Sequence, residues 1–232
     1  MPEDSQLITA LKSPVLRVIG TYLWFFISPA LGVLFVVFGL HMDLAAVRDT
    51  YQNYSVVVTI IEFMAYGLIP VALFFLCRDS PGDYGIRKKG LGSSLMFSLA
   101  FAGSILLIHL IATGSPVPAY VQAYHSPFPL NVVNAILGFV VHGPVEVFFV
   151  LWLIENTDQA LKNEEKTSAM GLLITVAVFG AMHIITTGDI TNAARVLVGF
   201  LVLGAIYKFT GNSLGPMIGW TLINGQAWHY LI

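Results

Sequence analysis

The sequence NVVNAILGFVVHGPVEVFFVLWLI, residues Asn131–Ile154, is a continuous apolar run that is long enough to cross a bilayer as a helix. It contains one carboxylate, Glu146, and an ionised carboxylate at this depth costs at least about 3 kcal/mol. His142 lies four residues before Glu146 and Phe149 three residues after it, so the three side chains share one helix face. The run predicts a membrane-spanning helix with a functional Glu146. The alternative is a neutral, structural Glu that is hydrogen-bonded to a neighbouring helix.

The whole chain has the composition of a membrane protein. Of its 232 residues, 56% are hydrophobic and only 10% are charged, whereas a soluble domain carries about 25% charged residues. Mean hydropathy is +0.80, and apolar segments of about 20 residues recur along the chain. These features predict an all-α polytopic transmembrane helical bundle that forms one membrane domain over residues 1–232. The net charge of −2 and the absence of a basic run speak against nucleic-acid binding.

Seven spans are expected from the apolar segments. They are Val15–Leu40, Tyr54–Cys77, Ser93–Ala112, Asn131–Ile154, Ser168–Ile185, Asn192–Phe209 and Ser213–Ile232. In this arrangement Arg48 and Arg195 fall on one side of the membrane, and the nine other basic residues fall on the opposite side. The nine are Lys12, Arg17, Arg78, Arg87, Lys88, Lys89, Lys162, Lys166 and Lys208. This bias predicts an integral, multi-pass membrane protein with a cytoplasmic N-terminus and the C-terminus outside. An eight-span alternative breaks the first segment at Pro29.

Polar side chains recur in two later spans. The string FGAMH places Phe179 and His183 one turn apart, and the last span places Trp220 and Asn224 one turn apart. A single His inside a membrane often does no more than hydrogen-bond between helices. Asn224 is equally consistent with helix pairing and with a donor to an oxyanion. These residues become candidates for a site because a polar group in lipid needs a polar partner.

Other features of the spans have simpler interpretations. Glu62 lies in the middle of the second span, where it either pairs with Arg195 or lines a cavity. Gly215 and Gly219 form a GxxxG surface in the last span, which is typical of close helix packing and not of chemistry.

The order of these elements resembles the CPBP family of intramembrane proteases, which includes the type II CAAX prenyl endopeptidases and bacteriocin-processing and immunity proteins. The family pattern is Glu-Glu-x-x-x-Arg, then Phe-x-x-x-His, then His-x-x-x-Asn or Asp. Phe179, His183 and Asn224 match it. The resemblance covers about residues 83–232 and is most specific over GFLVLGAIYKFTGNSLGPMIGWTLIN, residues 199–224.

The first and third motifs of the family are incomplete in this chain. Val145 and Val147 flank Glu146, so only one Glu is present, and no Arg follows at the family spacing. Trp220 stands where the family has its second His. The indole offers only an N–H donor, so it cannot act as a base or a metal ligand.

The resemblance implies a CPBP-like fold and a glutamate-type endopeptidase. In this interpretation Glu146 and His183 activate water and Asn224 donates to the oxyanion, so these three are the predicted catalytic residues. His142, Phe149, Phe179 and Trp220 are predicted to be auxiliary or substrate-binding residues. The expected substrate is a peptide or lipidated peptide in the bilayer, cut near the cytoplasmic membrane face.

No cofactor or metal is expected, because Glu146 and His183 give two ligands, His142 is a doubtful third, and a catalytic zinc usually needs three. The alternative function is a catalytically inactive relative that acts as a membrane binding or scaffold protein. A transporter has less support, because no second half of the chain repeats the first.

Overall fold

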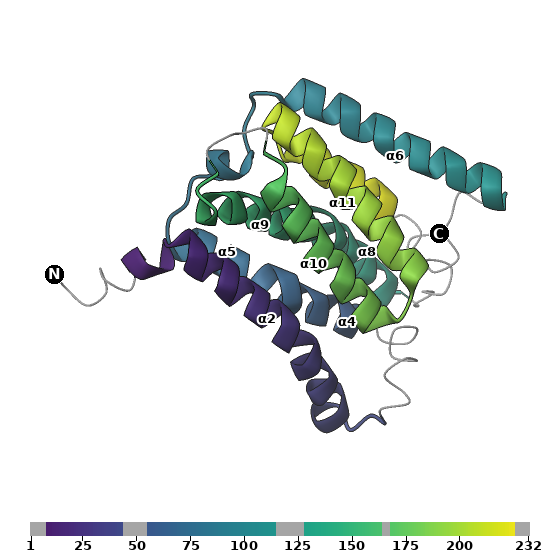
Figure 1. The fold of residues 1–232 in the computed structure, drawn as a ribbon. Coiled ribbons are helices and arrows are strands. Elements are labelled where there is room, and N and C mark those ends of the chain that lie inside the picture. Colours follow the sequence, from purple (N-terminus) through teal and green to yellow (C-terminus); the bar gives the residue numbers. More distant parts are fainter. Residues whose placement is uncertain (1–7, 44–54, 115–127, 164–167, 226–232) are drawn as a thin grey trace.

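The structure is a computed structural model that describes residues 8–43, 55–114, 128–163 and 168–225 (Figure 1). In these ranges the chain forms helices and connecting loops and no strand. The all-α prediction is confirmed for this part of the chain.

The helices follow one another along the chain, and several continue into a π-helical turn, labelled η. They are α2 (Pro14–Leu34), η1 (Phe35–Gly39), α4 (Ser55–Glu62), η2 (Phe63–Gly67), α5 (Leu68–Leu76), the 3-10 turn η3 (Pro81–Tyr84), α6 (Leu91–Thr113), α8 (Leu130–Val140), η4 (Val141–Val145), α9 (Glu146–Ala160), α10 (Met170–Thr187), α11 (Ile190–Thr210), α12 (Leu214–Trp220) and η5 (Thr221–Gly225).

Five of the described helical segments are long and apolar enough to cross a membrane, which supports a multi-pass integral membrane protein. They are Pro14–Gly39, Thr59–Leu76, Leu91–Thr113, Leu130–Ala160 and Ile190–Thr210, and Met170–Thr186 is a shorter apolar helix. The first segment runs through Pro29 as one helix, as the seven-span prediction requires. The last expected span is described only as far as Gly225.

Helix α9 forms the centre of the bundle. Its residues Val147–Ile154 are buried, most of them completely, because α2, α10 and the segments around η2 and η4 pack against it. Helix α6 lies at the edge of the bundle, beside α11 (Figure 1), and exposes large apolar side chains such as Ile108 and Ile111. An apolar outer surface around a covered central helix is the arrangement that lipid favours, and it lets α9 carry polar groups away from lipid.

The GxxxG surface of the last span packs as predicted. Gly215 and Gly219 of α12 face Ser94 and Ser98 of α6, and a Cβ atom on either glycine would press against those residues. Both serines are completely buried by this contact. The glycines therefore bring the two helices together and leave the opposite face of α12 free to meet α9 and α11.

One end of the bundle, which we call the basic end, carries most of the Lys and Arg residues. Here Arg17 of α2 donates to both carboxylate oxygens of Asp79, at 2.8 and 3.0 Å, and the Tyr84 hydroxyl donates to Asp79 at 2.8 Å. Burial raises the pKa of Tyr84, which keeps the phenol protonated as a donor. Lys208 donates to Asp158 at 2.7 Å. These bonds join α2, the loop after α5, α9 and α11.

Candidate active site

Glu146 is the first residue of α9 and directly follows the π-helical turn η4. Pro144 lies inside η4, and a proline there cannot make the regular α-helical hydrogen bond because it has no N–H. Single π-helical turns occur frequently at functional sites, because the extra residue re-aims the side chains around it. Glu146 is 3% exposed, so its carboxylate lies inside the bundle.

Two side chains of the last described helix hold the Glu146 carboxylate. Trp220 donates its indole N–H to Oε2 of Glu146 at 2.7 Å, and the Asn224 amide donates to the same oxygen at 3.1 Å. Both donors are neutral, and both bonds go to Oε2 rather than to Oε1. The carboxylate is therefore fixed in position through one oxygen while the other can accept a bond from water or substrate.

Glycines allow this close approach. The Trp220 ring packs against Gly199 of α11, where a Cβ atom would collide with the indole. Gly143 of η4 meets Thr221 of η5 in the same way. The backbone of η4 at Gly143 is therefore in contact with the Thr221 side chain of η5. This contact places Trp220 and Asn224 beside Glu146.

Arg195 of α11 is the site residue that sequence reasoning missed, since it was considered only as a partner for Glu62. Its Nη2 donates to Oδ1 of Asn224 at 3.1 Å and to Oδ1 of Asn192 at 2.9 Å. A guanidinium has only donors. The Asn224 amide must therefore present its oxygen to Arg195, which turns its N–H₂ group toward Glu146. An Arg near the start of a span was the signal that could have indicated this role.

His142 forms a second polar group next to the first. Its Nε2 lies 3.4 Å from Glu62, and its Nδ1 lies 3.5 Å from the Tyr66 hydroxyl. Glu62 and Tyr66 come from α4 and the π-helical turn η2, so two π-helical turns meet here. The His142 and Glu62 side chains are 23% and 28% exposed. The structure thus pairs Glu62 with His142, and Tyr66 is a neighbour that the sequence did not indicate.

His183 is connected to the site through aromatic rings. Its Nδ1 donates to the Phe179 carbonyl at 3.0 Å, and its ring centroid lies 4.7 Å from that of Phe179. The Phe179 ring packs against the ring of Phe149, with 5.7 Å between their centroids. Phe149 lies on α9, about one turn after Glu146. The described hydrogen bonds of Glu146 go to Trp220 and Asn224. The predicted joint role of Glu146 and His183 in activating water stays a prediction.

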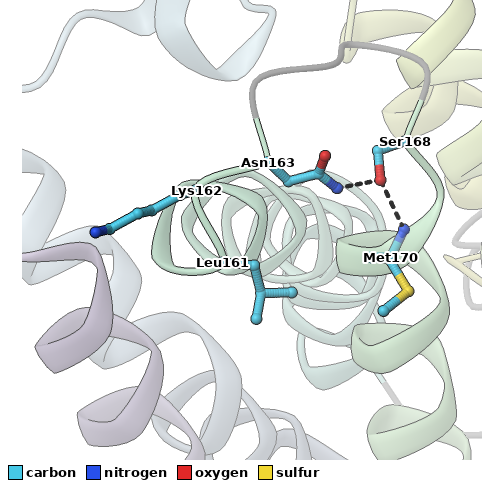
Figure 2. Close-up of a pocket in the computed structure, with 5 residues that line it drawn as sticks. All are labelled: Leu161, Lys162, Asn163, Ser168 and Met170. Atoms are coloured by element: carbon cyan, nitrogen blue, oxygen red, sulfur yellow. Dashed lines mark hydrogen bonds between the residues drawn. The ribbon is translucent and has the colours of Figure 1, made fainter.

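The site differs from the pocket in Figure 2, which has a volume of about 400 Å³. That pocket lies where α9 ends and α10 begins, and it is lined by Leu161, Lys162, Asn163, Ser168 and Met170. Within it the side chain of Asn163 and the Met170 N–H both donate to the Ser168 hydroxyl (Figure 2). None of the predicted site residues lines it. Among the described residues, no group of three or more His, Cys, Asp and Glu side chains is placed to hold a metal ion.

Residues 126–225 match the family model described as type II CAAX prenyl endopeptidase Rce1-like. No curated protein and no solved structure shows a significant match to the chain. The matched range begins just before α8 and ends with η5, so it includes Glu146, His183, Trp220 and Asn224. The resemblance noted from the sequence is confirmed: over residues 126–225 the chain carries an Rce1-like domain of the type II CAAX prenyl endopeptidases, the CPBP family.

Proposed function

We propose that the protein is a glutamate-type intramembrane endopeptidase in which Glu146 is the proton acceptor. The observation that carries the proposal is the carboxylate itself, which is buried and fixed through Oε2 by two neutral donors. The Rce1-like domain implies membership of an intramembrane protease family, whose substrates are peptides at the bilayer. Among the described residues Glu146 forms no salt bridge, which suits proton transfer because no ion pair among them must break before the proton moves.

The proposed reaction has two steps, the attack of water on the peptide carbonyl and the breakdown of the tetrahedral intermediate. Glu146 takes a proton from a water molecule while the water oxygen bonds to the peptide carbonyl carbon, and the carbonyl becomes a tetrahedral oxyanion. The Asn224 N–H₂ group, 3.1 Å from Glu146, is close enough to donate to that oxyanion. The C–N bond then breaks, and Glu146 returns its proton to the amine that leaves.

The other predicted residues support this step. His183 donates its Nδ1–H to the Phe179 carbonyl and is assigned to orient the water. Trp220 holds the carboxylate in place. Phe149 and Phe179 form the apolar wall beside it. His142 lies next to this group in its pair with Glu62.

The proposed topology has seven spans, a cytoplasmic N-terminus and the C-terminus outside. It rests on the Lys and Arg bias and on the candidate spans. A cysteine placed at Asn163, at the basic end, is expected to react with an impermeant reagent only from the cytoplasmic side. Reaction from the outside would contradict this topology.

The test of function is cleavage by purified protein in lipid nanodiscs, with a proteome-derived peptide mixture as substrate and mass spectrometry as readout. Glu146→Gln keeps shape and hydrogen bonding but cannot take the proton, so cleavage is expected to disappear. Glu155→Gln, on the same helix at the basic end, is the matched control and is expected to cleave. Equal cleavage by both variants would contradict the proposal.

A second function is favoured by one observation: the two donors that hold Glu146 would also satisfy a neutral structural carboxyl. The protein would then be an inactive relative that binds a peptide or lipid. In that case the wild-type protein cuts no peptide, and Glu146→Gln changes neither binding nor thermal stability.

A further inference from the structure

A continuous line of hydrogen bonds runs from Glu146 to one end of the bundle. Asn224 donates to Glu146 at 3.1 Å, Arg195 donates to Asn224 at 3.1 Å, and Arg195 also donates to Asn192 at 2.9 Å. The Asn192 N–H donates to Asp189 at 3.0 Å, and Asp189 is the exposed N-cap of α11. The buried carboxylate is thus connected by polar groups to the connection between α10 and α11. We use "α10–α11 turn" for residues 187–192, which include the last residue of α10 and the first three of α11.

The opposite direction from Glu146 is closed by apolar side chains. Toward the basic end, Val150, Leu151 and Leu153 of α9 are at most 1% exposed, and Phe200 and Leu203 of α11 are completely buried. By contrast, several polar residues on the other side of Glu146 are partly exposed; they are Glu62, His142, Asn192, Arg195 and Asn224. The residues that adjoin Glu146 toward the basic end are therefore buried and apolar, whereas those named on the other side are polar and partly exposed.

The positions of Arg195 and His183 along their helices also show that the site lies nearer to the α10–α11 turn than to the basic end. Arg195 is five residues from the start of α11 and fifteen from its end, which is about 7 Å and about 22 Å along the axis. His183 is four residues, about 6 Å, from the end of α10 at the same turn. The basic end is the far end of α11, where Arg87 donates to the Gly211 carbonyl. The polar groups that bind to or lie beside the site, Arg195 among them, therefore lie toward the end of the bundle opposite to the basic end.

We propose that water and peptide reach Glu146 from the α10–α11 turn, the end of the bundle opposite to the basic end. Water and a peptide backbone need polar partners on their way through a membrane protein. Among the described residues, this direction offers a series of polar side chains that is hydrogen-bonded to Glu146 itself. With the basic end in the cytoplasm, the substrate is a peptide segment on the outer side of the membrane. This differs from the sequence prediction of cleavage near the cytoplasmic face. The substrate part rests on the proposed function, whereas the access route does not.

The test is one-sided labelling of single cysteines in sealed vesicles, with a membrane-impermeant methanethiosulfonate reagent. The native Cys77 is buried and is replaced by Ala. Asn224→Cys reports on the site, and His142→Cys is a second reporter in case the first disturbs folding. Thr191→Cys marks the α10–α11 turn and Lys89→Cys marks the basic end, since both positions are exposed. Leu203→Cys replaces a completely buried residue of α11 on the basic-end side of Glu146 and is the matched internal control.

Both reporters are expected to react from the side on which Thr191→Cys reacts and to lose that reaction when the reagent is on the Lys89→Cys side. Leu203→Cys is expected to react from neither side. Reaction of the reporters from the Lys89→Cys side, or from neither side, would overturn the route. If the reporters react as expected but the protein cleaves no peptide, the route stands and the proposed function fails.

Discussion

The carboxylates at the basic end and the carboxylate of Glu146 are held in opposite ways. Asp79 accepts two bonds from the Arg17 guanidinium, and Asp158 accepts one from the Lys208 ammonium. Glu146 accepts from an indole and an amide, both neutral. A charge-assisted bond fixes the ionised form of a carboxylate and with it the positions of two helices. Neutral donors fix only the position, so the carboxylate can still exchange a proton with a substrate.

The basic end should therefore control stability, and the Glu146 region should control chemistry. Asp79→Ala leaves Arg17 buried without its carboxylate, and we expect a loss of about 3–5 kcal/mol of unfolding free energy. Thermal unfolding in detergent measures it. The control is Asp83→Ala, which removes an exposed side chain that closes a capping box with Ser80. Its expected loss of unfolding free energy is about 1 kcal/mol. Equal losses would mean that the buried Arg17–Asp79 pair contributes no more to stability than an exposed capping box.

Asn224→Ala is expected to lower the cleavage rate by roughly 10²–10³-fold, as for the loss of one oxyanion donor. The unfolding midpoint should change little, because the Trp220 bond to Glu146 remains. Steady-state cleavage kinetics measure the effect. A fall in stability without a change in rate would place Asn224 with the structural residues.

Arg195→Met is expected to lower the rate less, by about tenfold, since it removes a neighbour that orients the Asn224 amide. The distinctive readout is the double variant. In an Asn224→Ala background, Arg195→Met should cost almost nothing more, because the two residues act as one unit. Additive losses would show that Arg195 acts independently of Asn224.

Trp220→His is expected to have the smallest effect and to preserve or raise cleavage. An imidazole N–H can replace the indole N–H toward Glu146 and restores the residue type of the family pattern. The same cleavage assay measures it. Loss of cleavage with an intact fold would mean that the indole itself is required, for example through its packing on Phe200 at 4.6 Å.

Sequence reasoning identified the helices and the polar residues but not their connections. The apolar runs and the GxxxG spacing are local signals, so the five long apolar segments and the packing of Gly215 and Gly219 could be predicted. Glu146, Trp220 and Asn224 stood out because each is a polar group in an apolar run. The bond from Arg195 to Asn224 could not be predicted, because it depends on how α11 and η5 are rotated against each other.

The π-helical turns explain the remaining differences. Pro144 in the string HGPVE was visible, yet a proline can kink, break or widen a helix, and tertiary packing selects among these outcomes. The wider turn at η4 places His142 against Glu62 and Tyr66. Helical spacing alone could put His142 on the Glu146 face but could not supply these partners from another helix.

The central claim is that Glu146 activates water for peptide hydrolysis, and isotope transfer tests it most directly. The purified protein in nanodiscs is incubated with the peptide mixture in H₂¹⁸O, and the new carboxyl termini are analysed by mass spectrometry. We predict one ¹⁸O atom in each new carboxyl group with the wild-type protein and no product with Glu146→Gln of equal thermal stability. Products that form equally with Glu146→Gln, or no cleavage by the wild-type protein, would contradict the claim.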